Sequence, residues 1–254
     1  MRTVLARIAV RKEELTGHPF LEYIADSSVD PAERLSFAPC IAPFVLGFAD
    51  VNVLGLRDLD ADHDRVQHLV NEHTYKGDHR WPMFLDDLET MGLNHATDRV
   101  SMLRELWGPD RQAGRQLVYG LMRLAVTAEP VERIAVVEAV EATGYVAWQS
   151  FLTASGDYFD ATGRQLRYFG PEHAALETGH AMGGEDIGVE LQHIELWDSQ
   201  RRRALDMVDE VFRLFTAMLT EQLNFLAVAD RVKRWPKPGV GTFSWISADG
   251  PRAR

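Results

Sequence analysis

The sequence contains a single cysteine, Cys40, among its 254 residues. One thiol excludes an intrachain disulfide and an iron–sulfur cluster held by this chain alone. It fits a reducing cytoplasm, which is the location we expect for this protein. It also argues against a structural zinc site built from thiolates, because such a site needs several of them.

Long hydrophobic runs and an excess of basic residues are also lacking. The longest apolar stretch, Ile41 to Phe48, contains Pro43 and Gly47 and is too short to span a bilayer. Residues 1–10 contain neither the apolar run nor the cleavage site of a signal peptide. The formal net charge is −11, whereas phosphate binding needs clustered Lys and Arg. We therefore expect a soluble globular protein, with neither a nucleic acid nor a membrane as its partner.

Short β-rich segments that alternate with turn signals are absent, and apolar residues recur at helical spacing along most of the chain. The segment from Pro130 to Ala154 has the clearest stripe, formed by Ile134, Val137, Tyr145, Trp148 and Leu152. A second helical segment, Asp60 to Met91, contains Gly77 and Pro82, which we expect to interrupt it. The pattern predicts an all-α protein with about seven helices.

One helical domain accounts for most of the chain. We expect residues 1–30 to be a loose lead-in with one short helix at His18 to Ala25, followed by the domain at 31–232. A polar loop is expected at Gly156 to Gly163, and a helix at Leu166 to Met182 with Pro171 in its first turn. Residues 233–254 contain several prolines and glycines, so we expect an irregular tail.

Three groups of polar residues have helical spacing and the chemistry of metal ligands. Glu72 and His79 are seven residues apart, about two turns at ~3.6 residues per turn, so both project from one face. Glu138 and Glu141 lie in an apolar stripe, where a carboxylate is costly unless it is paired or bound to a metal. The third group has offsets of four and seven residues, again on one face: His173, Glu177 and His180.

Together, with one glutamate from the second group, these residues offer three imidazoles and three carboxylates. Such a set suits two Fe(II) or Mn(II) ions. The spacing alone leaves open whether Glu138 or Glu141 takes part. The motif Glu190-x-x-His193 repeats the Glu-x-x-His pattern of ferritin-like carboxylate bundles thirteen residues after the first such motif. Glycines separate the two motifs, so we keep Glu190 and His193 as alternates and interpret His193 as a supporting or structural residue.

The sequence resembles the haem-oxygenase-like di-iron oxidases over roughly residues 31–230. The resemblance rests on a mid-chain glutamate and on two motifs, Glu72-x6-His79 and His173-x3-Glu177-x2-His180. It extends to the segments that flank these motifs, His79 to Leu88 and Leu166 to Gly170. It implies a bundle of about seven helices, shaped like haem oxygenase but without haem, that holds two irons.

The resemblance also implies which residues bind the irons. By position the mid-chain ligand is Glu141, thirty-two residues before His173, and Glu138 remains an alternative on the same face. The last carboxylate is often Asp in this family, where this chain has Glu177. The implied ligands are Glu72, His79, Glu141, His173, Glu177 and His180.

The reactions of the family are diverse, and all use Fe(II) and O2. Among them we expect N-oxygenation of a small amine or amino acid, supported by an external electron donor. Polar residues on helices expected near the site favour a polar substrate: Tyr75, Asp78, Thr143 and Gln149. Oxidative C–C cleavage or desaturation of an amino or fatty acid by the same site is the alternative.

Two alternative functions would not require a metal. One is a helical binding protein in which these polar residues merely line a pocket, and the other is a metal-free enzyme of the same helical shape. The second would need a nucleophile or base, and the lone thiol of Cys40 has no evident partner in the sequence. The expected partners are a small-molecule substrate and an electron donor, and the sequence is compatible with a homodimer.

Overall fold

The computed structural model of the chain describes residues 1–77, 80–94, 98–178 and 190–234. All regular secondary structure in these residues is helical, which confirms the all-α class. Prolines and glycines divide it into more α-helices than the seven expected. They are α1 (Arg2–Thr16), α2 (Pro19–Ala25), α3 (Pro31–Arg34), α4 (Ala42–Asp50), α5 (Arg65–Gly77), α6 (Trp81–Thr90), α7 (Arg99–Trp107), α8 (Gln112–Val126), α9 (Pro130–Thr162), α10 (Pro171–Thr178) and α12 (Asp198–Arg234).

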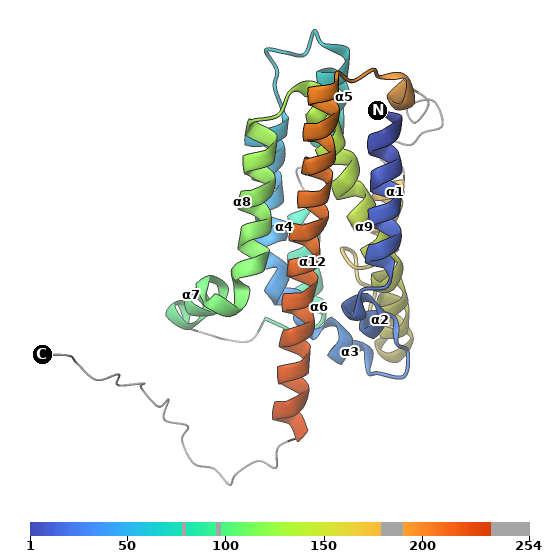
Figure 1. Cartoon of the computed structure of the whole chain (residues 1–254). Helices are drawn as coiled ribbons and strands as arrows, with labels where there is room; N and C mark the ends of the chain where they lie inside the picture. Colours follow the sequence, from blue (N-terminus) through green and yellow to red (C-terminus); the bar gives the residue numbers. More distant parts are fainter. Residues whose placement is uncertain (78–79, 95–97, 179–189, 235–254) are drawn as a thin grey trace, which may run out of the picture.

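Helix α9 is the centre of the bundle. It has 33 residues and packs against α1, α2, α5, α8, α10 and α12. Figure 1 shows α9 and the 37-residue α12 running in the same direction, with α8 antiparallel to both. Because α9 packs against so many helices, the polar residues on its inner faces lie in the interior or at a cavity, whereas others, such as Gln149, are exposed.

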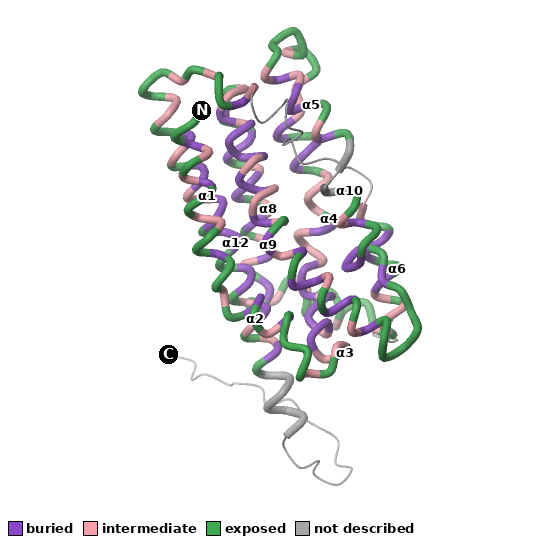
Figure 2. Tube along the Cα trace, turned by 90° about the vertical axis from the view of Figure 1, so that its right-hand side faces the viewer, coloured by how far each residue is buried: buried purple, intermediate pink, exposed green. Residues whose placement is uncertain are grey.

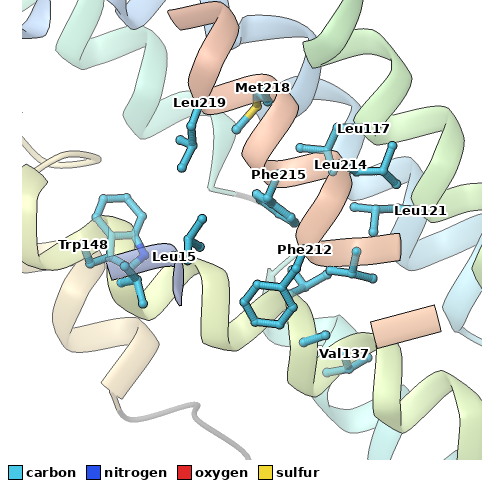
Figure 3. Packing of buried hydrophobic residues seen from close by; sticks show 14 of the residues in the cluster. Leu15, Leu117, Leu121, Val137, Trp148, Phe212, Leu214, Phe215, Met218 and Leu219 are labelled. Carbon is cyan, nitrogen blue, oxygen red and sulfur yellow. The ribbon is translucent and has the colours of Figure 1, made fainter. Parts of the chain in front are cut away.

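The core between α8, α9 and α12 is built from large apolar side chains (Figure 3). Those labelled there are buried, and α12 contributes half of them: Phe212, Leu214, Phe215, Met218 and Leu219. Leu117 and Leu121 face them from α8, and Val137 and Trp148 from α9. Each fully buried side chain of this kind stabilises the fold by about 1.5–3 kcal/mol, so this interface fixes the positions of the helices around the cavity.

The segment Pro31–Leu56 is 26 residues long and has a mean hydropathy of 1.7, which by length and composition alone would allow it to cross a membrane. Prolines divide it, as expected: after α3 come the 3-10 helix η1 (Leu35–Ile41), α4 and the π-helix η2 (Val51–Leu56). Both α4 and η2 pack against α8. Packing in the bundle accounts for part of this apolar character: 39% of the apolar window is buried, whereas Leu46, Val53 and Leu54 are exposed.

The N-terminal residues differ from the loose lead-in that the sequence suggested. Besides the expected short helix α2, they form the 15-residue α1, which packs against α9 and α12. Val4, Ile8 and Leu15 are its buried residues, with offsets of four and seven on one face. Arg7 and Arg11 donate hydrogen bonds to Asp209 of α12. The apolar periodicity of α1 is weak in the sequence because charged residues occupy half of the other positions.

The interruption predicted near Gly77 and Pro82 is confirmed, since α5 ends at Gly77 and α6 begins at Trp81 with Pro82 in its first turn. The helix expected from Leu166 begins only at Pro171, as α10, because residues 164–170 are not helical. The predicted loop at Gly156 to Gly163 was wrong, because α9 continues to Thr162 and ends where Gly163 adopts a φ of 70°. A glycine inside a helix costs only about 1 kcal/mol, which the packing of the preceding turns offsets.

Gly120 and Gly156 provide a matched test of the packing between α8 and α12. A Cβ at Gly120 would lie 2.5 Å from Cδ1 of the buried Leu214, whereas a Cβ at the exposed Gly156 meets nothing within 4 Å. We expect Gly120→Ala to lower the free energy of unfolding by about 1–3 kcal/mol through overpacking. Gly156→Ala should raise it by roughly 0.5–1 kcal/mol through helix propensity. Urea denaturation measures both, and equal effects would contradict the close packing.

Candidate metal centre

A cavity of about 130 Å³ lies in the bundle beside α9. In Figure 2, α12 lies on one side of α9, and α5, α6 and α10 lie on the other. Side chains from all of these helices line the cavity, and most of them are apolar or aromatic. The hydrogen-bonding residues among them are Asn52, His73, Arg80, Glu141, Thr143, Tyr168, His173 and Gln222, with Trp81 and Trp148.

His173, a predicted ligand, is buried in the first turn of α10 and faces this cavity. Its Nδ1 lies 3.0 Å from the backbone oxygen of Tyr168, and its Nε2 lies 3.1 Å from Nη1 of Arg80. A carbonyl can only accept and a guanidinium can only donate, so Nδ1 carries the proton and Nε2 is the acceptor. Burial, and next the Arg80 charge, lower the pKa of His173 to about 3. The imidazole is therefore neutral, and its Nε2 lone pair accepts a hydrogen bond from Arg80, which also lines the cavity.

Asp87 holds the segment that presents His173. This carboxylate is buried on α6 and accepts hydrogen bonds from the backbone N–H groups of Arg167 at 2.6 Å and Phe169 at 2.9 Å. Burial raises the pKa of Asp87, and these backbone donors partly offset the increase. The carbonyl of Tyr168 lies between the two held residues, so Asp87 fixes the acceptor that orients the imidazole of His173.

Glu141, the predicted mid-chain ligand, also lines the cavity. Its Oε1 lies 3.1 Å from Nε2 of His73, which comes from α5. The Nδ1 atom of His73 is buried and has no hydrogen-bond partner. Sequence analysis missed His73, although Val66, Leu69 and Val70 give the signal: their apolar stripe continues to position 73 at offsets of seven, four and three.

Glu138, the alternative to Glu141, is one turn earlier on α9 and does not line the cavity. Its Oε1 is buried and has no hydrogen-bond partner. Burial, and next the negative charge of Glu141, raise the pKa of Glu138 to about 7. Of the two glutamates only Glu141 lines the cavity, so it is better placed to bind a metal ion there. Glu138 is a buried carboxylate one turn away on α9.

The first motif predicted two ligands, Glu72 and His79, and neither is found at the cavity among the described residues. Glu72 is exposed on α5, with Oε1 3.6 Å from Nε2 of His68. His79 lies outside the described residues. Residues 72 and 73 are successive on one helix, so the helical face that brings His73 to Glu141 directs Glu72 elsewhere.

In the last motif, Glu177 belongs to α10 but its side chain lies outside the described part, and His180 lies wholly outside it. Of the alternates, Glu190 pairs through both oxygens with Arg65, at 2.9 Å each, and His193 is exposed. Within the described ranges no three His, Cys, Asp or Glu side chains form a group that could hold a metal ion. The complete ligand set therefore stays a prediction.

The described residues at this wall of the cavity fit an iron site in three respects. Their donors are nitrogen and oxygen, as Fe(II) accepts. His173 is neutral and held through its other nitrogen, as metal-bound histidines usually are. Nδ1 of His73, at the cavity, and Oε1 of Glu138, one turn from Glu141 on α9 but outside the cavity lining, are buried without a hydrogen-bond partner. A buried polar atom without a partner lowers stability in an apolar interior. A nearby cation would compensate the negative charge of the ionised carboxylate.

The two glutamates of α9 can be separated experimentally. We expect Glu141→Ala to lose or greatly weaken the binding of one iron, because Glu141 lines the cavity beside His73. Glu138→Ala should keep iron and part of the activity. Iron content after anaerobic loading with Fe(II), measured by a ferrozine assay, distinguishes the variants. The opposite pattern would move the ligand role to Glu138.

Comparison with known proteins identifies the fold. No protein-family model matches the chain. The search of curated proteins also found no match. Among solved structures, it is similar to a domain of unknown function with a haem-oxygenase-like fold from Shewanella denitrificans OS217. The TM-score is 0.63 at 17% identity, covering 90% of this chain and 94% of the other. The chain therefore has a haem-oxygenase-like fold.

Proposed function

We propose that this protein is a non-haem di-iron enzyme that uses O2 to oxidise a small molecule. The observation that carries the proposal is the neutral, held imidazole of His173 facing the same cavity as Glu141. The haem-oxygenase-like fold agrees with the family that the sequence motifs resemble. The residues proposed to hold the irons are Glu141 and His173, which line the cavity, with Glu72, His79, Glu177 and His180 from the motifs. The proposal for Glu72 rests on the resemblance alone, because its side chain is exposed in this structure.

When bound, two ferrous ions supply the electrons that reduce dioxygen. The protein's own contribution is to orient and to exclude water. The hydrogen bond from Nδ1 to the Tyr168 carbonyl keeps the Nε2 lone pair of His173 directed to Arg80 at the cavity, so a metal ion bound at Nε2 would take the place of this contact. The rings of Trp148 and Tyr168 pack against the imidazole, with centroids 4.3 Å and 4.5 Å from it. This aromatic enclosure limits solvent around the reacting atoms.

The reaction we favour is N-oxygenation of a small amine or amino acid. Arg80 carries a buried positive charge at the cavity, and it is suited to pair with the carboxylate of an amino acid. The apolar lining disfavours an ammonium ion, so a bound amine would be held in the neutral form that can be oxidised at nitrogen. Of the polar residues expected near the site, only Thr143 lines the cavity, since Tyr75 and Gln149 are exposed and Asp78 lies outside the described residues.

The apolar lining supports a second candidate reaction. Phenylalanines from five helical elements enclose most of the cavity: Phe20, Phe37, Phe44, Phe48, Phe151 and Phe215. This surface fits a substrate with an apolar body. Oxidative C–C cleavage or desaturation of an acid with a hydrocarbon chain, its carboxylate at Arg80, is therefore the alternative for the same site.

Metal loading tests the proposed function. The wild-type protein, loaded anaerobically with Fe(II) and desalted, should retain close to two irons per chain. His173→Ala should lose most of this iron with unchanged helical content, measured by circular dichroism. Absence of bound iron in the wild type would contradict the proposal and favour a metal-free binding protein.

Glu72 and His73 provide a control within one helix. As the resemblance implies a ligand at 72, Glu72→Ala should lose iron, and His73→Ala should retain more of it. Loss of iron in His73→Ala alone would transfer the ligand role to the residue that contacts Glu141 in this structure.

The reaction is tested by a substrate panel. The iron-loaded protein is supplied with a reductant, ¹⁸O2 and a set of amino acids, amines and fatty acids, and the products are analysed by mass spectrometry. We expect the gain of labelled oxygen on nitrogen. Loss of CO2, or of two hydrogens without a gain of oxygen, would instead establish cleavage or desaturation.

A further inference from the structure

Gln222 on α12 is a buried polar residue that the metal site leaves unexplained. Its side chain is fully buried, at 0% exposure, and it lines the cavity. Neither Nε2 nor Oε1 has a hydrogen-bond partner. Leaving a buried amide unsatisfied costs about 1–3 kcal/mol per group, so its retention in the core calls for a partner that enters the cavity.

The position of Gln222 on α12 separates it from the proposed metal ligands. It follows Phe215, Met218 and Leu219 at offsets of seven, four and three, and all four residues line the cavity from one face of α12. His73, Glu141 and His173 belong to α5, α9 and α10. Figure 2 shows α5 and α10 on the far side of α9 from α12. A molecule in the cavity would thus meet the amide of Gln222 on one wall and the proposed metal ligands on another.

The chemistry of the amide limits which group it recognises. Its Nε2 donates and its Oε1 accepts, and both are unpartnered. A carboxylate would satisfy only the donor and would face the carbonyl oxygen with a negative charge. Among the described residues that line the cavity, Arg80 is the one permanent cation, and it is hydrogen-bonded to His173. A neutral group that both donates and accepts, such as a hydroxyl or a primary amide, matches Gln222.

We infer that the wall formed by α12 is a binding subsite for an apolar, ring-sized ligand that carries a neutral hydroxyl or carboxamide group, and that Gln222 selects that group. The cavity of about 130 Å³ is close to the roughly 150 Å³ apolar cavity that holds benzene in another protein. Calling the bound molecule the substrate rests on the proposed function. The subsite itself does not require iron.

Phenol and toluene form a probe pair of nearly equal size in which a hydroxyl replaces a methyl group. In calorimetric titrations of the metal-free, full-length protein, phenol should bind at least about tenfold more tightly than toluene. Gln222→Leu, a substitution of similar size, should reverse this preference. It should also raise the Tm of the ligand-free protein, because it removes an unsatisfied buried amide. Gln149→Leu, at an exposed position of α9, is the control and should leave the ratio of affinities unchanged.

Three results would overturn the inference: no binding of either probe, an equal affinity for both, or the same preference in Gln222→Leu as in the wild type. A fall in Tm for Gln222→Leu with unchanged selectivity would show a structural role instead. Since no iron is present, these results are independent of the metal-loading experiment. If the protein binds iron but does not discriminate between the probes, the proposed function stands and the inferred subsite is contradicted.

Discussion

Two carboxylates on the buried side of the central helix are the constraint on which the site depends. Helix α9 is covered by other helices along most of its length, so Glu138 and Glu141 cannot reach bulk water easily. Burying an ionised carboxylate costs several kcal/mol unless a cation or hydrogen-bond donors compensate. His73 provides one partner for Glu141, whereas Oε1 of Glu138 has none and the pKa of that residue rises to about 7. Two divalent cations beside α9 would remove this cost.

On the wall opposite α12, neighbouring residues hold the neutral imidazole of His173 on the same side of the cavity as Glu141. Asp87 fixes the backbone around Tyr168, the Tyr168 carbonyl fixes the tautomer of His173, and burial keeps that imidazole neutral. The other wall contributes an amide, Gln222, within apolar side chains. The cavity therefore has one wall with charged and imidazole side chains and one neutral wall, an arrangement that suits the proposed oxidation of a small molecule.

Periodicity predicted the helical class and the buried stripe of α9, because long amphipathic helices repeat the same face many times. It failed for α1, whose three buried positions are separated by charged residues, and at Gly156, where a single weak helix former does not end a well-packed helix. At the site, the sequence placed Glu141 and His173 in the interior, and the structure brings both to one cavity.

Long-range geometry accounts for the residues that the sequence did not reveal. Arg80 and Gln222 reach the cavity from segments far apart in the chain, and no local spacing marks their convergence with His173. Gln222 had a partial signal, as a polar residue within the stripe of Phe215, Met218 and Leu219. Glu72 and His73 show the limit of motif spacing: an offset of seven places two residues on one face, but the neighbouring apolar residues decide which face is inside.

The anomalous scattering of iron in crystals grown anaerobically with Fe(II) tests the central claim most directly. Our account predicts two strong peaks in the cavity wall between Glu141 and His173. Peaks only at exposed pairs such as Asp62 and His68, or no peaks at all, would contradict it.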